Sequence, residues 1–107
     1  MKISVIGCGY LGAVHAAGMA ELGHDVVGID VDQNKVDRLN ASEAPFFEPG
    51  FDELLRKTSD RLSFSTEMSD LKDATVHFLT VGTPQSPTGA ADMTYVNQAV
   101  EALLPFL

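Results

Sequence analysis

The chain has 107 residues, of which 45% are apolar and 21% charged, so it is long enough for one ordinary domain and too short for two. Seven basic against fifteen acidic residues give a formal charge of -8. No cluster of Lys or Arg can neutralise a run of phosphates, which argues against nucleic acid as a partner. No apolar stretch approaches the roughly 18 residues of a membrane-spanning helix. The single cysteine, Cys8, cannot form an internal disulfide, so we expect a cytosolic domain with no membrane partner.

Two strand-and-helix pairs open the chain. Residues 3–6 are a short apolar, β-branched run, which predicts a buried strand. From residue 10 to residue 22, apolar or small side chains recur at spacings of three and four, which predicts a helix. Residues 26–29 predict a second strand, and Asp32 is well placed to cap a second helix.

The middle of the chain has weaker signals. Two prolines and a glycine interrupt residues 44–50, which predicts a structured loop. We expect a short helix over residues 52–57, a brief third strand over 62–65 and a helical turn over 68–72.

The last third begins with a stronger signal. Residues 74–81 are rich in Val, Thr and Phe and predict a fourth strand. A polar loop is expected over residues 85–91, followed by a helix that Asp92 caps. The apolar face of this helix is expected to contain Val96, Val100, Leu103 and Leu104.

Strands that alternate with helices predict parallel βαβ units with right-handed crossovers. In a doubly wound sheet the first and fourth strands are neighbours, and ligands bind in the crevice above their carboxyl ends. Residues 7–12 and 82–84 would both border this crevice. We therefore expect an α/β fold with a doubly wound parallel sheet of the Rossmann type, truncated after the fourth strand. The open edge of that strand favours self-association, such as a homodimer.

The segment Gly7-Cys8-Gly9-Tyr10-Leu11-Gly12 has the pattern G-x-G-x-x-G between a predicted strand and a predicted helix. Gly7 permits a tight turn, Gly9 has no Cβ to keep a diphosphate away, and Gly12 lets the helix pack closely. Free N–H groups at the start of the helix would bind the diphosphate of a dinucleotide. The alternative is a tight strand-to-helix turn with no ligand.

Asp30 ends the second predicted strand, 23 residues after Gly7. A carboxylate at this place can accept hydrogen bonds from the hydroxyls of the adenosine ribose, and it would repel a 2'-phosphate. The pattern therefore favours NAD over NADP. The alternative for Asp30 is a solvated residue at the end of a strand.

Two later stretches resemble those of one enzyme family. Residues 46–51, Phe-Phe-Glu-Pro-Gly-Phe, resemble the aromatic-Glu-Pro-Gly-Leu element of nucleotide-sugar 6-dehydrogenases, and residues 81–84 and 89–93 resemble their next element. Together with residues 9–12 they cover nearly the whole chain. The resemblance is closest to enzymes that act on UDP-glucose, with those that act on GDP-mannose near relatives. Phe51 replaces the usual Leu, and Leu11 the usual Val.

The resemblance implies which residues hold NAD. They are the glycine turn, including Tyr10 and Leu11, then Asp30, Lys35, Gly82 and Thr83. Lys35 would reach the adenosine ribose or a phosphate; the alternative is an exposed helix lysine. Thr83 would bond the cofactor from the edge of the crevice, or else serve only the turn. Glu48 is expected to support its own loop.

The resemblance also implies a reaction: two successive hydride transfers to NAD that oxidise UDP-glucose to UDP-glucuronate through a cysteine thioester. The cysteine, lysine and aspartate of that reaction belong to later segments of such enzymes, so no catalytic residue is assigned here. Cys8 lies far upstream of the family's nucleophile, although a helix amino terminus can make a thiol reactive. The three histidines show no spacing typical of a metal site.

We therefore interpret residues 1–107 as part of an NAD-binding domain, with the substrate domain elsewhere. Two alternatives share the opening motif: a regulatory NAD-binding module of the potassium-transport type, and another nicotinamide dehydrogenase of the 3-hydroxyacyl or 6-phosphogluconate type. The elements at residues 46–51 and 81–84 argue against both.

Overall fold

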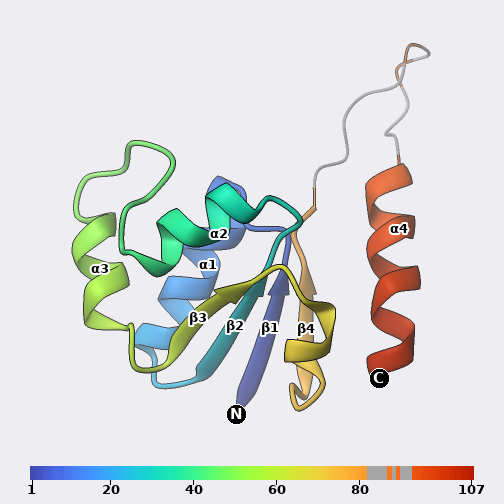
Figure 1. The fold of residues 1–107 in the computed structure, drawn as a ribbon, viewed down its shortest axis with the longest axis horizontal. Helices are drawn as coiled ribbons and strands as arrows, with labels where there is room; N and C mark the ends of the chain where they lie inside the picture. The colour runs from blue at the N-terminus through green and yellow to red at the C-terminus, as the bar shows by residue number, and fades with distance from the viewer. Residues whose placement is uncertain (82–86, 88, 90–92) are drawn as a thin grey trace.

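The computed structural model describes residues 1–81, 87, 89 and 93–107. Four parallel strands form one sheet in the order β3-β2-β1-β4 (Figure 1). The strands are β1 (Lys2–Ile6), β2 (Asp25–Ile29), β3 (Leu62–Ser65) and β4 (Val76–Leu79). This order confirms the predicted doubly wound sheet, with β1 and β4 as neighbours.

The helices follow the predicted positions closely. They are α1 (Tyr10–Glu21), α2 (Gln33–Asn40), α3 (Phe51–Lys57), the 3-10 turn η1 (Met68–Leu71), α4 (Thr94–Leu103) and the 3-10 turn η2 (Leu104–Phe106). Strand β4 is shorter than the predicted 74–81. The N-cap position of α4 falls on Met93, whereas Asp92 and most of the loop over 85–91 lie outside the described residues. Within the described part, no helix has the length and apolar character needed to cross a membrane.

The register of the sheet aligns the carboxyl ends of three strands. Strand β1 pairs with β2 up to Ile6 opposite Ile29, and with β4 up to Ile6 opposite Leu79. The residues that directly follow these strands therefore lie along one edge of the sheet: Gly7, Asp30 and Thr80. This edge is where a doubly wound fold places its ligand.

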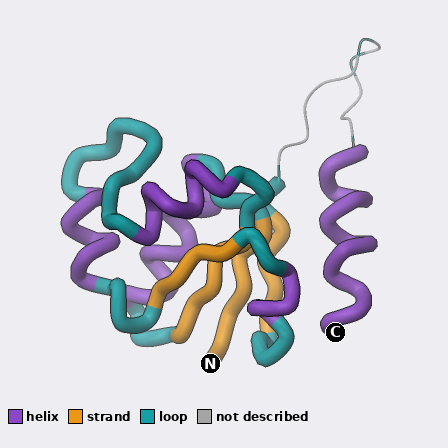
Figure 2. Tube along the Cα trace, in the orientation of Figure 1, coloured by secondary structure: helices purple, strands orange, loops and turns teal. Residues whose placement is uncertain are grey.

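Two apolar clusters cover the two faces of the sheet. On one face, Ile3 and Val5 pack with the alanines of α1 and with residues of α2 and α3. On the other, Ile6, Val27 and Ile29 pack with Leu71 of η1 and Leu103 of α4. Figure 2 shows the strands between these helices. The sheet thus forms the middle layer of a three-layer fold.

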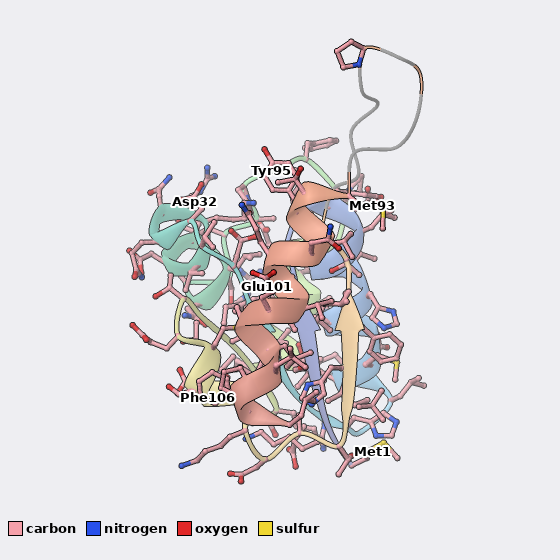
Figure 3. The ribbon with its side chains drawn as sticks, turned by 90° about the vertical axis from the view of Figure 1, so that its right-hand side faces the viewer. Met1, Asp32, Met93, Tyr95, Glu101 and Phe106 are labelled. Atoms are coloured by element: carbon pink, nitrogen blue, oxygen red, sulfur yellow. The ribbon has the colours of Figure 1, made fainter. Side chains whose placement is uncertain are left out.

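Helix α4 lies in front of β1 and β4 but is poorly covered (Figure 3). Of its predicted apolar face only Leu103 is buried, while Val100 is 38% and Leu104 58% exposed. The prediction of this face was therefore only partly right. The spacing of apolar residues identifies one side of a helix, but it does not show how much of that side a neighbour covers.

A glycine in the middle of β2 makes room for two larger side chains. A Cβ atom on Gly28 would lie 2.5 Å from Cδ1 of Phe64 and 2.9 Å from Sγ of Cys8. Both Phe64 and Cys8 belong to the cluster on the α1 face. The absent side chain at this position is thus part of how the core fits together.

Candidate cofactor-binding site

The turn between β1 and α1 is fixed by its neighbours on both sides. Gly7 has a φ of +97°, which favours glycine, and a Cβ there would lie 2.8 Å from the backbone nitrogen of Val81. Its own N–H donates to the carbonyl of Ile29 at 2.7 Å. The first glycine of the motif is therefore required by the turn itself, as predicted.

The third glycine allows α1 to approach the turn. A Cβ on Gly12 would lie 1.9 Å from the carbonyl oxygen of Gly7 and 2.6 Å from Oγ1 of Thr80. The Thr80 hydroxyl in turn bonds the carbonyl oxygens of Ile6, at 3.1 Å, and Gly7. Thr80 was missed from the sequence, yet the predicted pairing of the first and fourth strands already places it beside the turn.

The second glycine differs from the other two. Apart from the adjoining residues of the turn and helix, no atom of the described part of the chain lies within 4 Å of the position that a Cβ on Gly9 would occupy. The N-cap residue, Gly9, has no side chain that could cap α1, and the first turn of the helix contains no acidic residue. Among the described residues, the N–H groups of Tyr10, Leu11 and Gly12 have no hydrogen-bond partner. Open space in front of unpaired amides at the positive end of a helix suits a bound diphosphate.

The Asp30 carboxylate joins the turn to the start of α2. Its Oδ2 accepts from the backbone N–H of Cys8 at 2.8 Å, and its Oδ1 from that of Asp32 at 2.9 Å. Burial alone would raise the pKa of Asp30, but these two hydrogen bonds and the ammonium of Lys35 together hold it below its usual value. Asp30 is therefore ionised at neutral pH.

The side chain of Lys35 forms an ion pair with Asp30. Its Nζ lies 3.3 Å from Oδ2, and the two side chains are 28% and 10% exposed respectively. Lys35 is thus not a freely solvated side chain, and its contact with the ribose or a phosphate stays a prediction. Asp32 caps α2 by accepting from the backbone N–H of Lys35, which confirms the predicted cap.

Cys8 is fully buried, which contradicts the idea of a reactive thiol. Its Sγ faces the carbonyl oxygens of Val5 and Ile29. Burial and the nearby Asp30 carboxylate raise the pKa of Cys8 to about 12, against a smaller opposing effect of Lys35. Desolvation of the thiolate is the largest of these effects, and it makes the thiol less reactive.

We expect Cys8 to resist alkylation in the folded chain. Below the raised pKa the thiol stays protonated, so iodoacetamide at neutral pH should modify it more than about 100-fold more slowly than in urea-unfolded chain. Mass spectrometry over time measures both rates. Comparable rates in the two samples would show that the turn opens readily.

The loop over residues 44–50 reaches the amino end of α1. The phenol of Tyr10 donates to Oε2 of Glu48 at 2.8 Å. This hydrogen bond, together with the carboxylate charge, raises the pKa of Tyr10. Glu48 was expected to support its own loop, and this hydrogen bond shows that it also contacts the first residue of α1. Leu11 is 75% exposed.

The cofactor contacts predicted for Gly82 and Thr83 stay predictions. Gly82 and Thr83 lie outside the described residues. His15 packs edge-on against Phe78, and His77 bonds Ser4 through Nδ1. In the described segments, no group of three or more His, Cys, Asp or Glu side chains is arranged to hold a metal ion.

Two hollows lie away from the turn. One, of about 480 Å³, runs along β3 at the edge of the sheet, and its lining includes Lys2, Asp25 and Arg61. The other, of about 320 Å³, lies beside the loop and is lined by residues such as Phe47 and Arg56. Neither contains a free backbone donor of the turn. We therefore place the ligand site at the exposed edge of the sheet and not in either hollow.

A tight glycine turn with free amides, beside an ionised carboxylate at the next strand tip, is the arrangement of a dinucleotide-binding domain of the Rossmann class. The family described as "UDP-glucose/GDP-mannose dehydrogenase family, NAD binding domain" matches residues 1–107. The chain therefore belongs to this family and is its NAD-binding domain. This assignment supports the resemblance over the regulatory and other dehydrogenase alternatives.

Similar proteins agree on the family but not on one substrate. The chain is 42% identical to UDP-glucose 6-dehydrogenase YwqF of Bacillus subtilis, over 96% of this chain and 24% of that protein. It resembles the UDP-glucose dehydrogenase of Pyrobaculum islandicum, with a TM-score of 0.90 and 44% identity over 95% of this chain and 24% of that one. It also resembles GDP-mannose dehydrogenase of Pseudomonas aeruginosa, with a TM-score of 0.92 and 37% identity over 96% and 24%. The chain thus spans about a quarter of each of these proteins.

Proposed function

We propose that this chain is the cofactor-binding part of an enzyme that oxidises C6 of a nucleotide sugar with NAD, and that the sugar is UDP-glucose. The observation that carries the proposal is the set of unpaired amides in front of the open space at Gly9. The choice of UDP-glucose is supported by similarity to proteins named for that substrate. The likeness to a GDP-mannose dehydrogenase makes GDP-mannose the competing substrate.

In this proposal each part of the site has one task. The N–H groups of Tyr10, Leu11 and Gly12 bind the pyrophosphate, with Gly7 and Gly9 shaping the turn. Asp30 accepts hydrogen bonds from the ribose hydroxyls, because Oδ1 receives one backbone bond and keeps a free acceptor position. Lys35 holds the carboxylate in place. Gly82 and Thr83 would also contact the cofactor, a role that only the family resemblance supports.

NAD would supply the hydride acceptor, while the chain binds and orients it. The family resemblance assigns the nucleophilic cysteine, the lysine and the aspartate to segments outside residues 1–107. Cys8 cannot replace that nucleophile, because it is buried and protonated at neutral pH. We therefore propose that this chain binds the cofactor without turnover, in a cytosolic setting.

Titration calorimetry with NAD tests the proposal. We expect saturable binding of NAD, at least about tenfold tighter than that of NADP because Asp30 repels a 2'-phosphate. Mixing the chain with NAD and UDP-glucose should give no NADH absorbance. Absence of NAD binding by a chain shown to be folded would refute the cofactor role, and accumulation of NADH would refute the lack of turnover.

Self-association remains a prediction. Strand β4 is an edge of the described sheet, and Val76 and Leu79 on it are 36% and 39% exposed. Unpaired strand edges with exposed apolar side chains favour pairing with a second copy.

A further inference from the structure

A hydrogen bond and a ring contact connect the loop over residues 44–50 to the first residue of α1. The hydroxyl of Tyr10 donates to Oε2 of Glu48 at 2.8 Å. The ring of Tyr10 meets that of Phe46 edge-on, with centroids 5.2 Å apart. Tyr10 therefore contacts the loop at two places, although 38 residues separate it from Glu48 in the sequence.

The loop itself is anchored to the core. Phe46 stacks on Phe51 with ring centroids 5.3 Å apart, and Phe51 is only 3% exposed. The backbone N–H of Ala44 donates to Asp52, and its carbonyl accepts from Arg38. The loop thus has a fixed position from which it can restrain a neighbour.

Tyr10 has a second role in the proposed site. Its backbone N–H is one of the unpaired donors at the start of α1. Restraining its side chain also restrains the backbone of the first helical residue, which would otherwise fray. A donor that is aligned before binding does not have to be ordered when the ligand arrives.

We propose that Glu48 is a positioning residue for the phosphate-binding turn, acting through the phenol of Tyr10. This inference rests on the proposed NAD function. It also assigns a specific role to Tyr10, whose side chain orders the turn while its amide binds the phosphate. Glu48 does not touch the cofactor.

What the turn requires from residue 48 is an acceptor and not a charge. A carboxylate near a bound diphosphate is, if anything, electrostatically unfavourable, and at this exposed position salt screens most of that effect. A glutamine keeps an oxygen that accepts from the phenol. The conservative variant Glu48→Gln should therefore preserve the function that Glu48→Ala removes.

The test compares NAD affinity with stability in five variants of the chain. Tyr10→Phe and Glu48→Ala each remove the hydrogen bond, and each should weaken NAD binding about threefold. This loss is smaller than the roughly tenfold expected when a direct hydrogen bond to the ligand is lost, because the Tyr10–Glu48 bond acts only through the turn. Glu48→Gln should bind within about twofold of wild type. Tyr95→Phe removes an exposed hydroxyl elsewhere, and Phe47→Ala removes an exposed ring from the same loop; both serve as matched controls.

Thermal unfolding separates positioning from folding. Because the Tyr10–Glu48 pair is exposed, all five variants should unfold near the wild-type temperature. The double variant Tyr10→Phe with Glu48→Ala should bind no more weakly than either single variant, since both remove the same bond.

Three results would overturn the inference. The first is wild-type affinity, within twofold, in both Tyr10→Phe and Glu48→Ala. The second is additive losses in the double variant, and the third is failure of Glu48→Gln to preserve binding. If the wild-type chain is folded and does not bind NAD, the proposed function itself fails, which is a different outcome from equal binding by all variants.

Discussion

Gly9→Ala is expected to fold like the wild type and to lose NAD affinity on the order of 10- to 100-fold. A methyl group at Gly9 would lie more than 4 Å from every described residue that does not adjoin it in the turn or helix, and φ there is -68°, which alanine adopts readily. The small cost of alanine at an N-cap is offset by the lower entropy of the unfolded chain. The methyl would instead occupy the space in front of the free amides, costing one or more charge-assisted hydrogen bonds.

Gly12→Ala, in the same turn, is expected to lower the stability of the fold, which Gly9→Ala should leave unchanged. Its methyl would be placed 1.9 Å from the carbonyl oxygen of Gly7, so α1 or the turn must move, at a cost of about 1–3 kcal/mol or more in the free energy of unfolding. Urea unfolding and NAD calorimetry on both variants distinguish the two effects. If Gly9→Ala binds NAD like wild type, the diphosphate does not lie where we place it.

For Asp30→Ala we expect the preference for NAD over NADP to disappear. The substitution removes the acceptor for the ribose hydroxyls and leaves Lys35 without its partner, free to attract a 2'-phosphate. Affinity for NAD should fall about tenfold or more, whereas that for NADP should stay level or rise. The chain should also lose about 1–3 kcal/mol of stability, because the N–H of Cys8 loses its acceptor.

Calorimetry with both cofactors at one ionic strength measures this change, since phosphate binding depends on salt. Asp32→Ala is the matched control. It removes the cap of α2, which costs about 1 kcal/mol of stability, but it leaves the ribose acceptor in place. An unchanged ratio of the two affinities in Asp30→Ala, or an equal shift in Asp32→Ala, would contradict the role of Asp30.

The fold was largely predictable because the local signals agreed with one another. The β-branched runs of β1 and β2, separated by a helical pattern, determine a parallel unit, and this unit implies the order of the sheet. Helix α4 shows the limit of this reasoning. Its periodicity located the helix correctly, but not the exposure of Val100 and Leu104, which depends on neighbouring elements.

The parts of the site that depend on backbone conformation were predictable from the sequence, whereas the contacts between side chains were not. The roles of Gly7 and Gly12 follow from a strand, a turn and a helix in sequence, and the structure shows close approaches at both. The Lys35–Asp30 ion pair depends on the rotamers of two side chains, which sequence patterns do not determine. The Tyr10–Glu48 contact joins two residues that are 38 positions apart in the sequence. It depends on the path of the chain between them, which local patterns do not determine.

The absence of a side chain at Gly28 has a consequence for the oxidation of the Cys8 sulfur. The ring of Phe64 and the sulfur of Cys8 both occupy the space next to Gly28, where a Cβ atom would lie. A bulkier residue at position 28 needs a smaller ring at position 64. Oxygen atoms added to the sulfur would likewise have no room, so oxidation of Cys8 would have to begin with partial unfolding of the domain.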